Sequence, residues 1–182
     1  RLDMKSQTKE EILAPGPFHR KETDYYYGAS KDKKGFLYFP THYGLVKYNY
    51  QNTKKFDTGI SLITKYDSVS NRIIFGQMNG LGFINEKENI EIVIDSSKQL
   101  VPSHPKTIVL DEEGNIWIGN NGCLTIYDRK KKCFSKIEGG RKHGVFYINK
   151  AVNANFWVGG KDGVWIYNSQ EAELRRVDDG IF

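Results

Sequence analysis

The sequence predicts an all-β protein built from repeated four-stranded sheets, and three observations support this prediction. Aromatic residues make up 13% of the 182 residues, and the chain has 18 Gly but only 5 Pro, which favours short strands joined by tight turns. A hydrophobic content of 38% beside 27% charged residues is typical of a globular chain rather than a disordered one. The third observation is an internal repeat with a period near 40 residues.

The repeat appears when four segments are aligned without gaps: residues 35–49, 71–85, 114–128 and 154–168. A large apolar or aromatic residue recurs at the same place in each, namely Tyr38, Ile74, Trp117 and Trp157. A turn position recurs at Gly44, Gly80, Cys123 and Gly163, so that the steps are 36, 43 and 40 residues. A β-rich repeat of this length is typical of the blades of a β-propeller.

Each unit is expected to contain four antiparallel strands, and the third unit shows the pattern most clearly. Its predicted strands are residues 106–111, 115–119, 124–128 and 133–137. A tight turn over residues 111–114 joins the first two strands, because Gly114 can adopt a positive φ. Residues 32–35 repeat this turn in the first unit.

The second strand of the third unit is apolar on both faces, since Ile116, Trp117 and Ile118 follow one another. A sheet buried on one side only would alternate apolar and polar residues. A propeller blade packs between two neighbours, which explains the uninterrupted run. Trp117 and Trp157 are therefore predicted to belong to the core between blades and not to a ligand-stacking surface.

The chain is divided into about four blades, which we expect to form an arc of a larger ring. Residues 1–3 resemble the end of a third strand, so residues 1–13 are predicted to be the last strand of a preceding blade. The predicted blades are residues 14–60, 61–98, 99–139 and 140–182. An open arc leaves apolar faces uncovered at its ends, and such faces usually find partners, here a neighbouring blade or a second copy of the chain.

Charge and cysteine spacing argue against nucleic-acid binding and against a disulfide bond. The net charge is +5, but the basic residues are scattered, and the run 129–132 is predicted to be a solvated hairpin tip. Nucleic-acid binding would need a stripe of basic side chains on one face, so none is expected. If that run is a turn, Cys123 lies about 16 Å along the strand from the residue opposite Cys133, too far for a disulfide. Two free thiols are predicted.

Residues 114–128 resemble the two-component regulator propeller repeat, whose pattern is Asp-x-x-Gly-x-Ile-Trp-Ile-Gly followed by Gly-Leu and Tyr-Asp. The matching residues in the third unit are Asp111, Gly114, Ile116, Trp117, Ile118, Gly119, Leu124, Tyr127 and Asp128. The fourth unit carries the pattern at Trp157, Gly159, Gly163 and Tyr167, and the first two units carry it more weakly. The resemblance covers essentially the whole chain.

This resemblance implies a function. Such repeats form the periplasmic sensor region of membrane-bound hybrid histidine kinases, especially in Bacteroidetes, and their signals are commonly oligosaccharides. The chain is then expected to be a periplasmic ligand-sensing fragment that signals to a kinase and reaches the membrane only through its parent protein. The family motif is structural, so it assigns no binding residue.

Candidate ligand-binding residues follow from where propellers usually bind ligands. That place is the rim formed by the loops between strands two and three and the connections from strand four to the next strand one. Aromatic, amide and basic side chains there suit sugars, because they supply stacking and directional hydrogen bonds. The candidates on this rim are His42, Tyr43, Asn79, His104, Asn121, Arg141, His143 and Lys161.

Neither a cofactor, a metal site nor a catalytic motif is expected. Zinc needs three or four ligands, which His104 and His143 do not complete, and no nucleophile occurs in a recognisable motif. Two alternatives to a sensor remain open. One is a structural arc that contacts other protein, and the other is a carbohydrate-active propeller enzyme, which would need two facing carboxylates from different blades.

Overall fold

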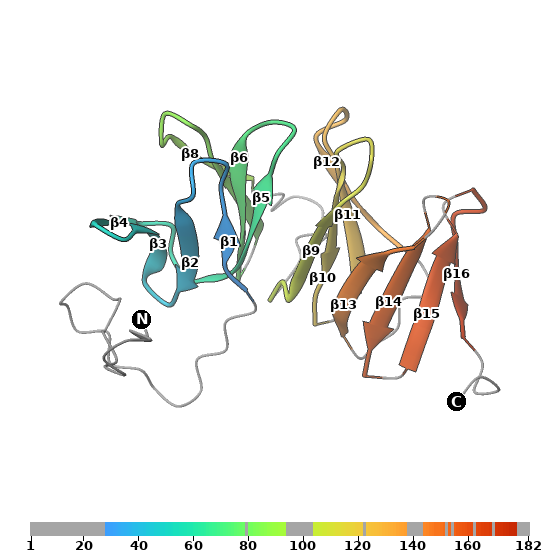
Figure 1. Cartoon of the computed structure of the whole chain (residues 1–182). Coiled ribbons are helices and arrows are strands. Elements are labelled where there is room, and N and C mark those ends of the chain that lie inside the picture. Colours follow the sequence, from blue (N-terminus) through green and yellow to red (C-terminus); the bar gives the residue numbers. More distant parts are fainter. Residues whose placement is uncertain are drawn as a thin grey trace, which may run out of the picture.

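The computed structural model describes residues 28–78, 80–93, 104–121, 123–137, 144–151, 153, 155–161, 163–168 and 170–177. These residues form four antiparallel sheets of four strands each, arranged in chain order as successive blades (Figure 1). The predicted all-β propeller arc of four blades is confirmed. The described residues contain no helix.

The strands follow one another along the chain within each blade. Blade 1 contains β1 (Ser30–Lys31), β2 (Leu37–Thr41), β3 (Gly44–Asn49) and β4 (Asn52–Phe56). Blade 2 contains β5 (Ser61–Asp67), β6 (Arg72–Gln77), β7 (Gly80–Ile84) and β8 (Ile90–Val93). Blade 3 contains β9 (Thr107–Leu110), β10 (Ile116–Gly119), β11 (Leu124–Asp128) and β12 (Cys133–Lys136). Blade 4 contains β13 (Val145–Lys150), β14 (Phe156–Gly160), β15 (Gly163–Asn168) and β16 (Glu173–Arg176).

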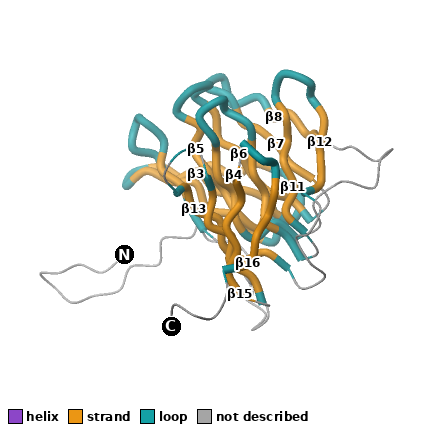
Figure 2. Tube along the Cα trace, turned by 90° about the vertical axis from the view of Figure 1, so that its right-hand side faces the viewer, coloured by secondary structure: helices purple, strands orange, loops and turns teal. Residues whose placement is uncertain are grey.

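The first strand of each blade lies on the inner side of the arc. β1, β5, β9 and β13 are the edge strands of their sheets, and contacts join β1 to β5, β5 to β9 and β9 to β13. The second view shows the strands of all blades running between two ends where the loops gather (Figure 2). The inner strands of four blades therefore share one surface.

The turn between the first two strands explains the recurring aspartate of the repeat. In blade 3, Asp111 accepts hydrogen bonds from the backbone N–H of Asn115 (2.7 Å) and from the indole N–H of Trp117 (3.0 Å). In blade 1, Asp32 accepts from the backbone N–H of Phe36 and from the Tyr38 hydroxyl. The predicted positive φ is found at the ends of both turns, 88° at Gly35 and 83° at Gly114. The aspartate thus holds the aromatic residue of the next strand in place.

Three apolar cores lie between successive blades. The recurring residue of the second strand enters each one, because Tyr38 packs between blades 1 and 2, Ile74 between blades 2 and 3, and Trp117 between blades 3 and 4. The Trp117 ring stacks on Phe156, with centroids 4.2 Å apart, and meets Tyr167 edge-on at 4.9 Å. The prediction that Trp117 belongs to the core between blades is confirmed.

The same prediction is wrong for Trp157. This residue occupies the repeat position of Trp117, but 44% of its surface is exposed, against 4% for Trp117. Trp157 lies on the side of blade 4 that points away from blade 3, where no sheet of the described residues packs. Tyr147 and Val164 are exposed on the same side. The pattern of the repeat predicts a buried face, but burial also needs a neighbouring blade.

The hairpin between β11 and β12 confirms one prediction and corrects another. Asp128 lies opposite Cys133, and both cysteines are free thiols. Arg129, however, is not part of a solvated tip. Its guanidinium is 2.5 Å from the Asp67 carboxylate at the β5–β6 turn of blade 2, and Asp67 is fully buried. Only Lys130, Lys131 and Lys132 of this run are exposed.

The buried Asp67 makes stability depend on pH. Burial alone raises the pKa of this carboxyl, but hydrogen bonds from Ser70 and Arg129 and the charge of Arg129 outweigh burial, so that its pKa lies below the usual 3.8. Because the folded pKa is lowered, the contribution of Asp67 to the free energy of unfolding is present above about pH 4 and is lost as the pH falls through the folded pKa. We expect Asp67→Asn to remove this component from a series of urea unfolding curves measured between pH 2 and pH 7. An unchanged slope in the variant would contradict the assignment.

Candidate functional site

The inner side of the arc is hollowed into a cavity of about 940 Å³, a size that accommodates a small-molecule ligand. The inner strands of all four blades contribute to it. The polar side chains that line it include Ser30, Thr64, Ser68 and Asn149, and the aromatic ones are Tyr66, Phe146 and Tyr147. Because these strands are sheet edges, part of their backbone N–H and C=O groups is also directed toward this space.

Every charged side chain among the lining residues is a lysine. The lysines are Lys31, Lys65, Lys106 and Lys150, one from each blade or from the residue just before its first strand, and no aspartate or glutamate is among the described residues that line the cavity. Three of them are exposed and Lys106 is half-buried. None of the four forms an ion pair with a residue in the described part of the chain. The cavity therefore combines a positive charge with aromatic and hydroxyl groups.

A β-bulge shapes the blade 4 side of the cavity. The pairing of β13 with β14 shifts between Val145 and Tyr147, which leaves Phe146 as the extra residue of the strand. Both Phe146 and Tyr147 are exposed as a result. The Lys106 ammonium lies 3.7 Å from the centre of the Phe146 ring, and burial lowers its pKa. Phe146 therefore contacts blade 3 through Lys106, whereas Tyr147 lies opposite Gly159 on the outer side of blade 4, and both residues border the cavity.

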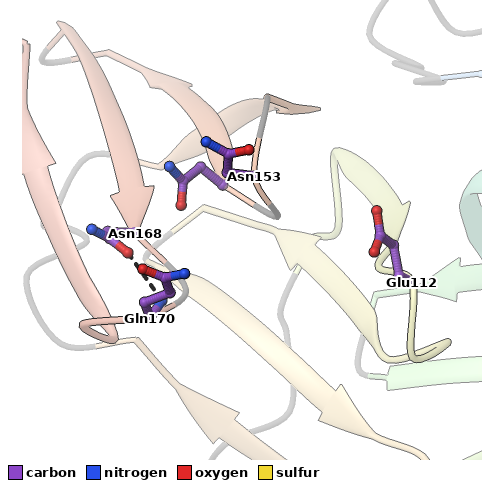
Figure 3. A pocket seen from close by; sticks show the side chains of 5 residues that line it. Glu112, Asn153, Asn168 and Gln170 are labelled. Atoms are coloured by element: carbon purple, nitrogen blue, oxygen red, sulfur yellow. Dashed lines mark hydrogen bonds between the residues drawn. The ribbon is translucent and has the colours of Figure 1, made fainter.

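A second, smaller depression of about 520 Å³ lies between turns of blades 3 and 4 (Figure 3). It is lined by Glu112, Asn153, Asn155, Asn168 and Gln170. These residues come from the turns between first and second strands and between third and fourth strands, at the end of the blades opposite to the predicted rim. Asn168 caps its own turn, since its side-chain oxygen accepts a hydrogen bond from the backbone N–H of Gln170 at 2.9 Å. Four of the five lining side chains are amides, but the Asn168 amide is already engaged in a hydrogen bond within its own turn.

The rim residues predicted from the sequence are only partly described. Asn79, Arg141 and His143 lie outside the described residues. His42, Tyr43, Asn121 and Lys161 are exposed on the loops between second and third strands, and His104 is half-buried where the chain enters blade 3. Binding by these residues stays a prediction.

The structure brings few of these candidates together. His42 and Tyr43 contact each other as sequence neighbours, with ring centroids 5.6 Å apart, and the Lys55 ammonium lies 5.6 Å from the centre of the Tyr43 ring. The backbone of His104, at a φ of 53°, donates a hydrogen bond to Met78 O, which ties two adjacent loops. None of the described rim residues lines either depression.

The inner cavity was not anticipated, and its signal in the sequence is weak. Lys31 and Lys150 occupy the same position in the first strands of blades 1 and 4, since they lie opposite the equivalent residues Leu37 and Phe156. Lys65 is shifted by one residue from that position, and Lys106 precedes its strand. An alignment of the repeats therefore does not place the four lysines in one column.

Two further observations concern the described residues alone. They include no group of three or more His, Cys, Asp or Glu side chains that could hold a metal ion. No helix capable of crossing a bilayer occurs among them.

Comparisons with known proteins support the fold. No protein-family model matches the chain, and no curated protein is detectably similar in sequence. The extracellular domain of a protein described as a hybrid two-component system of B. thetaiotaomicron superposes with a TM-score of 0.72 and 16% identity, over 86% of this chain and 25% of that one. Virginiamycin B lyase from Staphylococcus aureus gives a TM-score of 0.74 and 13% identity, over 97% of this chain and 61% of the lyase.

At these identities the similarity establishes the propeller fold alone. A surface component of the type-IX secretion system of Porphyromonas gingivalis also superposes, with a TM-score of 0.67 and 10% identity, over 85% of this chain and 23% of that one. The chain thus spans about a quarter of the sensor domain and about three fifths of the lyase. A sensor domain, an antibiotic lyase and a secretion component share this architecture, so the fold by itself does not assign the activity.

Proposed function

We propose that this chain is a ligand-binding part of an extracytoplasmic sensor and that the inner cavity binds the ligand. The observation that carries this proposal is that one cavity is lined by the first strands of all four blades. A ligand that contacts several blades binds most tightly to one arrangement of them, and such a differential affinity is what a sensor needs.

The chemistry of the cavity supports an oligosaccharide as the ligand. Tyr66, Phe146 and Tyr147 offer aromatic faces, while Ser30, Ser68 and Asn149 offer hydroxyl and amide groups. Sugar rings stack on the former and exchange directional hydrogen bonds with the latter. The volume of about 940 Å³ leaves room for more than one sugar ring.

The sensor role and its location rest on the similarity to the extracellular domains of B. thetaiotaomicron and on the repeat pattern of residues 111–128. In this proposal the chain lies in the periplasm as part of a longer protein that signals to a histidine kinase. A carbohydrate-active enzyme that uses two facing carboxylates is less well supported, because no aspartate or glutamate is among the described residues that line the cavity.

Thermal unfolding with a panel of plant, host and microbial oligosaccharides tests the proposal. A ligand present at 100 times its Kd stabilises the folded chain by about 2.7 kcal/mol and raises the Tm. We expect one class of saccharide to do so, and Tyr147→Ala to abolish the shift. Tyr50→Ala is the matched control, because both tyrosines are 70% exposed but Tyr50 does not line the cavity. No shift with any saccharide, or equal loss in both variants, would contradict the assigned site.

A further inference from the structure

The positive charge of the inner cavity indicates a narrower class of ligand than sugars in general. Lys31, Lys65, Lys106 and Lys150 come from four separate blades and line one hollow, and none of the described residues that line it is an aspartate or a glutamate. Positive charges that border one space repel one another, and this repulsion is reduced when a negative charge enters.

Lysines on the outer parts of the same blades have a different environment. The Lys47 ammonium lies 2.7 Å from the Glu88 carboxylate between blades 1 and 2, and Lys33 lies 2.9 Å from Glu86. Lys54 also pairs with Glu88. These three outer lysines are thus paired with glutamates, whereas the cavity lysines form no ion pair with any described residue.

Protection of sheet edges accounts for only part of this arrangement. Lysines on edge strands prevent edge-to-edge association, and Lys31, Lys65 and Lys150 lie on such strands. Lys106 lies before β9, is half-buried and rests on the Phe146 ring that the β13 bulge exposes. Burial lowers the pKa of its ammonium, so a nearby anion would restore part of the stabilisation that water supplies elsewhere. Edge protection does not require a lysine in that environment.

We propose that the inner cavity recognises an acidic oligosaccharide, whose carboxylate or sulfate groups bind to these four lysines. This inference rests on the proposed function and specifies its ligand class. The exposed aromatic residues Phe146 and Tyr147 border the cavity and contact the sugar rings, and Ser30, Ser68 and Asn149 bind the hydroxyls. The lysines therefore select acidic over neutral saccharides, because only the acidic ones supply the missing counter-charge.

Isothermal titration of the 182-residue chain with three tetrasaccharides tests the inference. The probes are tetragalacturonate, a sulfated heparin tetrasaccharide and neutral galactotetraose. We expect at least one acidic probe to bind and the neutral probe to bind at least tenfold more weakly. Affinity for the acidic probe should fall as NaCl rises from 50 to 500 mM, because salt screens the lysine charges. The carboxylated and sulfated probes then distinguish the two sources of negative charge.

Substitutions of the lysines that line the cavity test whether the saccharide binds there. Lys65→Gln and Lys150→Gln, which keep a long polar side chain, are each expected to weaken acidic binding about tenfold, as is usual for loss of a hydrogen bond to a charged group. Lys106→Met should do the same while preserving the apolar contact with Phe146. Lys136→Gln is the matched control, because Lys136 is an exposed lysine on the outer strand β12 and does not line the cavity. Its affinity should equal that of the wild type.

The outcomes separate this inference from the proposed function. Tight binding of the neutral probe, independent of salt and of the lysine substitutions, would overturn the acidic ligand and leave the sugar sensor standing. Equal weakening by Lys65→Gln and Lys136→Gln, or equal affinity for a short DNA duplex, would show nonspecific attraction of polyanions and overturn the inference. Absence of binding by every saccharide, here and in the wider panel, would overturn both proposals.

Discussion

Trp117→Ala is expected to lower the free energy of unfolding by about 3–5 kcal/mol, the usual cost of a cavity left by a large aromatic core residue. The indole is 4% exposed, stacks on Phe156 at 4.2 Å and donates a hydrogen bond to Asp111. The substitution removes the indole from the core between blades 3 and 4 and leaves Asp111 without one of its donors. Urea unfolding followed by far-UV circular dichroism measures the loss.

Trp157→Ala is the matched comparison, because Trp157 occupies the same position in the next repeat but is 44% exposed. Its side chain has no blade of the described residues packed on its outer side. We expect a loss below about 1 kcal/mol, as is usual for surface substitutions. Equal losses for the two tryptophans would mean that the outer face of blade 4 is covered in solution, and a concentration-dependent difference would identify a second copy of the chain as the cover.

Arg129→Ala is expected to cost about 3–5 kcal/mol, the usual range when one partner of a buried ion pair is removed. Asp67 is fully buried and the Arg129 side chain only 16% exposed, so the substitution leaves a carboxylate without its counter-charge inside the contact between blades 2 and 3. Ser70 still donates a hydrogen bond to Asp67, which limits the loss. Equilibrium unfolding in urea at pH 7 provides the value.

Two further variants isolate the ion pair. Asp67→Asn combined with Arg129→Ala should recover part of the loss, because no buried charge then remains, and the double-mutant cycle gives the coupling energy. Lys131→Ala is the control on the same hairpin, where Lys131 pairs with Asp128 in an exposed position. This control should leave the unfolding curve unchanged. If Arg129→Ala behaves like Lys131→Ala, the hairpin is solvated after all, as the sequence alone suggested.

The two corrections share a physical origin. A charged residue in a hairpin tip is normally solvated, and nothing in the residues around Arg129 indicates a partner 62 positions away in the chain. An alternating or continuous apolar pattern likewise tells which residues prefer burial, but not whether another sheet arrives to bury them. Whether Arg129 is solvated and whether an apolar face is buried both depend on where the neighbouring blades lie, and the local sequence does not contain that information.

The candidate site illustrates the same limit. The sequence directs attention to the loop rim, because loops at that end of propellers usually hold ligands, but the described rim residues do not line either of the two hollows described above. The four lysines of the inner cavity lie in different positions of their repeats and are as far apart as Lys31 and Lys150 in the chain. The adjacent aromatic residues Phe146 and Tyr147 at the start of blade 4 are a weak signal of the site in the sequence.

The four-stranded repeat, the turns closed by Gly35 and Gly114, and the pairing of Asp128 with Cys133 could be predicted from the residues alone, because these features depend on contacts within one blade. The three-dimensional arrangement was needed to show which apolar faces are buried, which charge pairs with Asp67 and which lysines line one cavity. These features depend on contacts between blades, where side chains distant in sequence meet at distances that no local pattern fixes.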